Sequence, residues 1–192
     1  MIKGLLTWKQ GEMMNDTNTD SRDRLMKRVM QAKEERKDFQ QELLQRHSLP
    51  VISLTLNLPG GYEEYPQFEE VFHSALRVLS ETFAGYMAEH HHRMGKWGPE
   101  GFWAVNLPAV RVKEKTMDIE EMHPLGRIFD IDVINEEGRG LSRRDFSREG
   151  RRCLVCEDPA IECYRGRRHE PGEVKDQVEE IIRKGLIRDE QE

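Results

Sequence analysis

The sequence lacks the features that mark membrane and secreted proteins. No apolar run approaches the length of a membrane span, and the apolar centre of residues 1–15 is too short for a signal peptide. We therefore expect a cytoplasmic protein with no membrane partner. Its three cysteines would then be reduced thiols, because disulfide bonds persist only in oxidising compartments.

An excess of positive charge is also absent. Asp and Glu number 36 against 30 Lys and Arg, which gives a net charge of -6. Since nucleic-acid binders neutralise phosphates with a basic surface, the overall charge predicts no nucleic-acid partner. The 192 residues contain neither an internal repeat nor a low-complexity linker. We expect one domain over residues 20–192, preceded by a disordered extension over 1–19.

Periodic apolar residues predict a mixture of helices and strands. Apolar positions at helical spacing indicate helices at 20–46, 67–88, 109–122 and 172–188. Alternating or short apolar runs indicate strands at 51–58, 101–106 and 127–135, with a return strand at 140–146. This order predicts an α+β fold: a small mixed or antiparallel sheet with helices packed on it, a long N-terminal helix and a helical C-terminal tail.

The strand predicted at 127–135 carries an unusual pair of acids. Asp130 and Asp132 stand two apart in an apolar run, so both would project from one face, with Cα atoms about 6.5–7 Å apart. Aspartate is disfavoured in strands, and like charges at this spacing repel. A solvated outer face would explain the pair without a function. A divalent cation would compensate the repulsion, and the pattern is typical of strands that hold Mg²⁺ against phosphates.

Arginines are concentrated after this strand, against the acidic trend of the chain. Residues 139–152 contain only two acids, Asp145 and Glu149, but six arginines: 139, 143, 144, 148, 151 and 152. Guanidinium groups bind phosphate oxygens bidentately. A solvated basic loop is the alternative for any single arginine, yet the whole group opposite two carboxylates favours phosphate binding.

The cysteines fall in the segment 153–169, where their spacing partly matches a zinc site. Cys153 and Cys156 form a Cys-x2-Cys pair, and Cys163 and His169 follow without forming a second closely spaced pair. Such a set could hold Zn²⁺, and ordinary packing of semi-buried thiols is the alternative. The histidines at 90–92 cannot chelate from one helix face, so we interpret them as an exposed helix end.

Taken together, the carboxy-terminal motifs resemble those of one enzyme family. They are HPLGR (123–127), FDIDV (129–133), LSRRD (141–145) and RRCL (151–154), followed by Cys156, Cys163, Arg165-Gly166 and His169. In this order and spacing they resemble the apo-citrate lyase phosphoribosyl-dephospho-CoA transferase family, the CitX proteins. Weaker similarity extends through GPEG (98–101) and through the strand and helix between residues 50 and 88.

The resemblance implies a specific reaction. CitX-like proteins transfer a prosthetic group from 2'-(5''-triphosphoribosyl)-3'-dephospho-CoA to a serine of the acyl-carrier (gamma) subunit of citrate lyase, and release diphosphate. This is a nucleotidyltransferase-type reaction, in which positioning and charge neutralisation supply most of the catalysis. Asp130 and Asp132 would hold Mg²⁺ between the phosphates. The triphosphate would be bound by three arginines: Arg127, Arg143 and Arg144.

The proton acceptor and the overall function have alternatives. Asp145 or a strand aspartate would accept the serine proton, and His123 is a second choice because a lone histidine before proline is more often structural. The chain could instead be a non-catalytic phosphate- or nucleotide-binding module, or an interaction adaptor organised by zinc at 153–169. The Gly-Ser that precedes Asp-x-Asp in polymerase-beta-type enzymes is absent here, so that fold is an analogy only.

Overall fold

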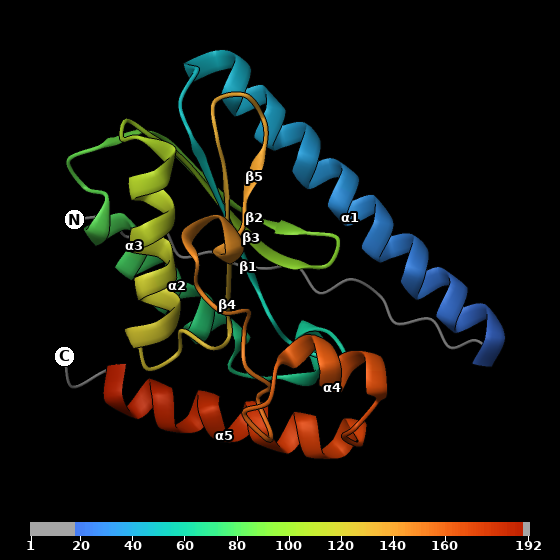
Figure 1. Cartoon of the computed structure of the whole chain (residues 1–192). Coiled ribbons are helices and arrows are strands. Elements are labelled where there is room, and N and C mark those ends of the chain that lie inside the picture. The colour runs from blue at the N-terminus through green and yellow to red at the C-terminus, as the bar shows by residue number, and fades with distance from the viewer. Residues whose placement is uncertain (1–17, 190–192) are drawn as a thin grey trace.

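The structure is a computed structural model that describes residues 18–189, apart from the side chains of residues 18–23 and 25. Within this range, helices cover both faces of one sheet (Figure 1). Of the extension predicted at 1–19, residues 1–17 lie outside the described residues, and 18–19 already belong to the first helix. No helix in the described range is both long and apolar enough to cross a membrane.

The elements confirm the predicted α+β class. The helices are α1 (Asn18–His47), α2 (Phe68–Thr82), α3 (Ala109–Met122), α4 (Ala160–Gly166) and α5 (Pro171–Asp189). The strands are β1 (Val51–Leu56), β2 (Met87–Gly95), β3 (Gly98–Val105), β4 (Phe129–Ile134) and β5 (Gly140–Leu141). Short 3-10 helices lie at Tyr62–Glu64 and Arg143–Phe146. The long N-terminal helix and the C-terminal helix are both present.

The sheet is antiparallel and is assembled from segments far apart in the chain. Its order is β2-β3-β1-β4-β5, and every neighbouring pair is antiparallel. Central strand β1 places Ser53 opposite Phe102 of β3 on one side and Asp132 of β4 on the other. Thr55 of β1 lies opposite Asp130. The Asp-x-Asp strand is therefore held in register by the middle of the sheet.

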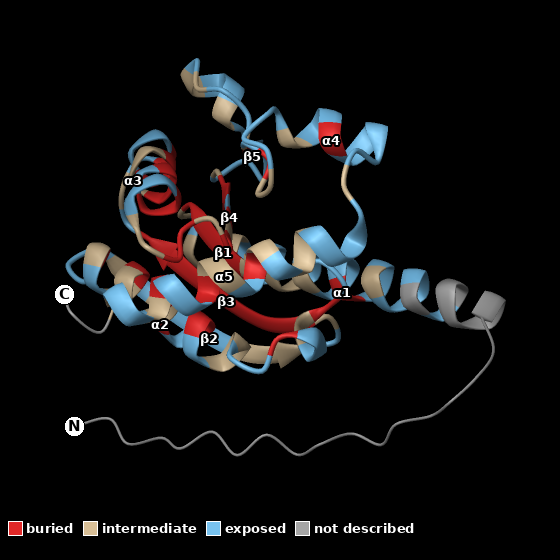
Figure 2. Ribbon diagram, turned by 90° about the horizontal axis from the view of Figure 1, so that it is seen from below, coloured by how far each residue is buried: buried red, intermediate tan, exposed pale blue. Residues whose placement is uncertain are grey.

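The two faces of the sheet are covered differently. One face carries a large apolar core, formed with α2, α3 and α5, that includes Ile52, Trp103 and Ile131. On the other face, Val51 and Phe102 are buried with Leu43 of α1. Figure 2 shows the buried residues concentrated along the strands and on the inward sides of the helices. Asp130 and Asp132 alternate with core residues of β4, so they belong to the face that α1 covers.

One strand was not predicted from the sequence. The helix predicted at 67–88 ends at Thr82, and Met87–Gly95 form the edge strand β2 instead. The interpretation of residues 90–92 as a helix end was therefore wrong, because these histidines pair with β3. Edge strand β2 has no buried position and so carries no apolar alternation; its backbone pairing with the wholly buried β3 holds it in place. The return strand predicted at 140–146 is also shorter, since β5 ends at Leu141.

Candidate active site

The Asp-x-Asp strand presents its two carboxylates as the sequence predicts. Phe129, Ile131 and Val133 are buried in the core, whereas Asp130 is half-buried and Asp132 is exposed. Asp130 is held by two contacts: Thr55 Oγ1 donates to its Oδ2 at 3.2 Å, and Arg151 Nη2 lies 3.2 Å from its Oδ1. The pair thus projects from a rigid strand toward solvent.

The carboxylate of Asp132 has no direct partner for its charge within the described residues. Its side chain makes no hydrogen bond or ion pair with any residue in the described range. Surrounding protein desolvates its carboxylate, and this together with the negative charge of Asp130 raises the pKa of Asp132; the positive charge of Lys113 opposes the shift. A cation at this position would relieve both desolvation and repulsion, which is the chemistry expected of a metal ligand.

The outer edge of β4 is closed by side chains of α3 instead of a strand. Short strand β5 pairs only with Val133 and Ile134. At Ile131 the backbone N–H donates to Glu120 Oε1 at 3.0 Å, and the carbonyl accepts from Lys113 Nζ at 3.1 Å. Glu120 and Lys113 are both buried, so they supply hydrogen-bond partners to backbone groups that would otherwise be buried without one.

Most of the predicted phosphate-binding arginines are engaged by acids. Arg143 donates to Glu120 and Glu121, each at 2.6 Å, and its side chain is only 16% exposed. Arg151 also contacts Glu120 and donates to the Phe129 carbonyl at 2.9 Å. Three further arginines in this group have carboxylate partners: Arg139 with Asp145, Arg148 with Asp118 and Glu121, and Arg152 with Glu149. Arg144 is exposed and has no side-chain partner among the described residues.

Glu120 is the centre of this network, and its removal should be costly. Glu120→Ala leaves Arg143 and Arg151 without their buried partner and the Ile131 N–H without an acceptor. We expect the free energy of unfolding in urea to fall by about 3 kcal/mol. Glu121→Ala is the matched control, because Glu121 lies on the same helix but is 46% exposed; its loss should cost about 1 kcal/mol or less. Equal losses for the two variants would contradict a buried hub at Glu120.

The other predicted site residues have local structural partners. Asp145 accepts from the backbone N–H of Ser142 at 2.7 Å and from its hydroxyl at 2.9 Å, and these two bonds chiefly lower the pKa of Asp145. His123 Nδ1 accepts from the Leu125 N–H, and its Nε2 lies 3.2 Å from Asp189 of α5. Asp145 therefore caps a turn, and His123 joins the loop after α3 to α5.

A large open pocket of about 1420 Å³ lies beside the Asp-x-Asp strand. Asp130 and Asp132 do not line it, but Arg151 does, and Arg151 contacts Asp130. The pocket is rich in arginine: Arg127, Arg143, Arg148, Arg151, Arg152, Arg165 and Arg167 line it. Its walls also include the loop before β4 and the segment around α4. The pocket is large enough for a polyphosphate ligand. Glutamates also line it (Glu64, Glu120, Glu121, Glu149 and Glu170), so the arginines available to phosphate are those without an acid partner.

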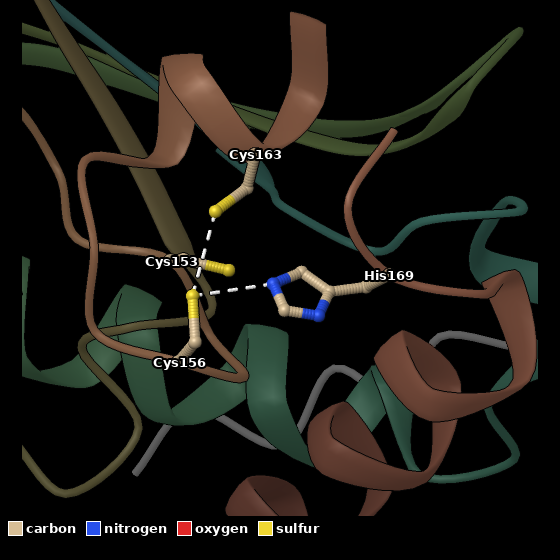
Figure 3. A group of neighbouring side chains, drawn as sticks. All are labelled: Cys153, Cys156, Cys163 and His169. Atoms are coloured by element: carbon tan, nitrogen blue, oxygen red, sulfur yellow. Dashed lines mark hydrogen bonds between the residues drawn. The ribbon is translucent and has the colours of Figure 1, made fainter. Parts of the chain in front are cut away.

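The predicted cysteine and histidine residues converge beside this pocket, which Cys153, Cys163 and His169 line. The ligand atoms of Cys153, Cys156, Cys163 and His169 all lie within 4.8 Å of one another. Cys156 Sγ is 3.4 Å from Cys163 Sγ and 3.2 Å from His169 Nε2 (Figure 3). Four such atoms at these separations match the tetrahedral ligand set of a structural zinc site. The group could therefore bind a metal.

The loop around Cys153 favours a thiolate. Burial opposes ionisation of the Cys153 thiol, but hydrogen bonds from the backbone N–H groups of Cys156 and Val155 outweigh it and lower its pKa to about 7. Cys163 differs, because burial and its two sulfur neighbours raise its pKa to about 12. Without a cation the cluster thus tolerates one thiolate but resists a second, whereas a bound metal would stabilise several.

Comparison with known proteins decides the family. A family model described as apo-citrate lyase phosphoribosyl-dephospho-CoA transferase, CitX, matches residues 25–185. The chain belongs to the CitX family. A protein of that name from Escherichia coli O9:H4 (strain HS) is 35% identical over 157 residues, which cover 80% of this chain and 86% of the relative. The protein of the same name from Shigella boydii serotype 18 (strain CDC 3083-94 / BS512) has the same identity and coverage.

The CitX match covers every site residue discussed above, including those that sequence reasoning missed. Glu120 was overlooked because its arginine partners, Arg143 and Arg151, lie 23 and 31 residues after it in the chain. The run "MDIEEM" at 117–122 was its only signal: several acids on a helix that precedes an arginine-rich segment. Arg127, predicted as a phosphate ligand, instead donates to the carbonyl of Cys153 at 2.9 Å and pairs with Glu157 at 3.1 Å. In this CitX chain Arg127 therefore ties the cysteine segment to the start of β4.

Proposed function

We propose that this chain, as one transferase domain, attaches the prosthetic group of citrate lyase. The chain would transfer this group from 2'-(5''-triphosphoribosyl)-3'-dephospho-CoA to a serine of the acyl-carrier (gamma) subunit and release diphosphate. Membership of the CitX family supports this proposal. The structural observation that carries it is the position of Asp130 and Asp132 beside an arginine-lined pocket: Arg151 lines this pocket and contacts Asp130.

Mg²⁺ fits the two strand carboxylates. Asp130 and Asp132 offer oxygen ligands from one strand face, and desolvation together with the negative charge of Asp130 raises the pKa of Asp132. Mg²⁺ prefers carboxylate oxygens together with substrate phosphates. When bound, it would neutralise charge on the phosphates of the donor. Arg144, which is exposed and unpaired within the described range, is the arginine of the original set with its guanidinium available to phosphate.

The reaction requires little covalent chemistry from the protein. The serine oxygen forms a bond to the phosphorus nearest the ribose, the bond from that phosphorus to the diphosphate breaks, and the serine proton passes to a base. Asp145 is a weak proton acceptor, because its hydrogen bonds with Ser142 and Arg139 already engage its carboxylate and lower its pKa. We therefore assign the proton to a strand aspartate.

Zn²⁺ is the metal best suited to the cysteine and histidine cluster. Three sulfurs and one ring nitrogen are a closed four-ligand set, which is typical of a structural ion. The second ring nitrogen of His169 lies 4.0 Å from a Glu173 carboxylate oxygen, so a small movement would bring the two groups to the hydrogen bond that often orients a metal-bound histidine. The site requires reduced thiols, in keeping with a cytoplasmic reaction. Because the apolar core lies in the sheet and not around these ligands, an adaptor organised by zinc is less well supported.

Intact mass measurement of the carrier tests the proposed transfer. The purified chain is incubated with apo-carrier subunit, Mg²⁺ and the triphosphoribosyl donor. We expect the carrier to gain the mass of the prosthetic group and diphosphate to appear in equal amount. A carrier variant with alanine at the acceptor serine is the control. An unchanged carrier mass, with donor binding demonstrated, would favour a non-catalytic nucleotide-binding module instead.

A further inference from the structure

Helix α4 and the residue that follows it place three side chains without polar partners in the described range at the arginine-lined pocket. Tyr164, Arg165 and Arg167 all line it. We infer that these residues form the binding site for the adenosine and phosphate portion of the dephospho-CoA donor. The adenine ring would stack on Tyr164, while Arg165 and Arg167 pair with phosphate oxygens. This inference deepens the proposed function and rests on it.

The charge in the pocket points to these two arginines. Arg143, Arg148, Arg151 and Arg152 are each paired with carboxylates, and Arg127 is paired with Glu157. Arg165 and Arg167 are exposed, and their guanidinium groups make no hydrogen bond or ion pair with any described residue. A ligand phosphate therefore displaces no carboxylate from either guanidinium group and can accept charge-assisted bonds from both.

Tyr164 supplies a flat apolar surface next to this charge. Its side chain is 83% exposed, although a large aromatic ring normally packs against protein. A ring left open inside a pocket is a platform for a planar base, as in proteins that stack nucleobases on aromatic side chains. The apolar side chains of Leu154, Val155 and Val174 line the same pocket and offer a dry surface for the pantetheine arm.

The position of α4 is fixed by contacts that leave this surface free. Cys163, directly before Tyr164, is buried and points into the cysteine cluster (Figure 3). Arg168 pairs with Asp158 at 3.1 Å and with Glu162 at 3.6 Å, and does not line the pocket. Arg167 ends the helix with a φ of 45°. These contacts hold the backbone of this segment, and they leave the side chains of Tyr164, Arg165 and Arg167 exposed and free to contact a ligand.

Equilibrium binding of 3'-dephospho-CoA to the purified full chain tests the inference. Tyr164→Ala should raise the dissociation constant for 3'-dephospho-CoA roughly tenfold. Tyr164→Phe should retain the affinity, because stacking needs only the ring. Arg165→Gln and Arg167→Gln should each weaken binding roughly tenfold and reduce its dependence on salt. Arg111→Gln is the control for loss of an exposed arginine; Arg111 lies on α3 and does not line the pocket, so this variant should bind like the unchanged chain. Affinity for 4'-phosphopantetheine, which has no adenine, should not change in Tyr164→Ala.

Other outcomes separate this inference from the transfer reaction. If the unchanged chain modifies the carrier while Tyr164→Ala and the Arg165→Gln/Arg167→Gln double variant keep full affinity for 3'-dephospho-CoA, the inference is overturned and the transferase function stands. Lack of 3'-dephospho-CoA binding by the unchanged chain would also overturn it. If 3'-dephospho-CoA binds as expected but the carrier mass never changes, the site on α4 stands and the transferase proposal fails.

Discussion

Asp132→Asn should reduce carrier modification by several orders of magnitude and leave the protein equally or more stable. The loss of activity follows if Asp132 holds Mg²⁺, because a group that acts in the transition state is removed. Stability should not fall, since the Asp132 side chain has no hydrogen bond or ion pair within residues 18–189 and its charge repels that of Asp130. The readouts are Mg²⁺-dependent carrier mass and the free energy of unfolding.

The raised pKa of Asp132 also predicts how the stability difference between the variant and the unchanged chain changes with pH. The folded-state pKa of Asp132 is raised above its ordinary value, chiefly by desolvation. The folded protein therefore holds this proton more tightly than the unfolded chain, and stability is lost as the pH rises from the ordinary pKa through the raised one. Asp132→Asn lacks that loss. The free energy of unfolding of the variant should therefore exceed that of the unchanged chain only slightly in acid, and by the largest amount above the raised pKa of Asp132.

Two further variants complete the test. Asp130→Asn should also be inactive, but slightly less stable, because it weakens the contacts with Thr55 and Arg151. Asp38→Asn, at an exposed position on α1, is the control for a surface charge and should keep full activity. Strand variants that are active but unstable would refute the metal assignment and leave the pair with a purely structural role.

Cys156→Ser should release a metal ion and loosen one wall of the pocket. We expect the unchanged chain to hold about one zinc per molecule, and the variant to hold little. Between residues 147 and 170 only Cys153 and Cys163 are buried, so this segment has almost no apolar core of its own. Amide hydrogen exchange in 151–170 should therefore accelerate by about two orders of magnitude, while exchange in β1 and β3 stays slow.

The cysteine prediction has its own controls. Ile161→Ser changes an exposed side chain of α4 that does not line the pocket. This variant should keep the zinc content and the slow amide hydrogen exchange of the unchanged chain. Removal of metal with a chelator should reproduce the exchange pattern of Cys156→Ser, and added Zn²⁺ should restore it. Unchanged exchange in metal-free protein would mean that the thiols are ordinary packing groups.

The parts of the fold that could be predicted are those where burial imposes a pattern. Helix α3 spans 109–122 as predicted, and β4 alternates core residues with Asp130 and Asp132 as its sequence requires. The Cys-x2-Cys spacing also identified a real cluster, because two ligands on a tight loop need only two more from nearby. In these segments the structure follows from residues that are close together in the sequence.

The rest depended on contacts between distant segments. The arginines after β4 form a basic cluster in the sequence, but α3 supplies acids that neutralise Arg143, Arg148 and Arg151. Charge density along the chain therefore overstated the charge available to a phosphate. The exposed arginines of α4 were not predicted as ligands, although they lie in the CitX-like motif, because only the fold reveals which guanidinium groups lack a partner.

The closed outer edge of β4 also limits how another chain can dock. An unpaired strand edge is a template on which a second protein can add a strand, by recognition or by aggregation. Here the Ile131 backbone groups are already occupied by Glu120 and Lys113. The opposite edge, β2, is lined with histidine and charged side chains that disfavour strand addition. We therefore expect a protein acceptor to be recognised through side chains and loops around the pocket, and never by extension of this sheet.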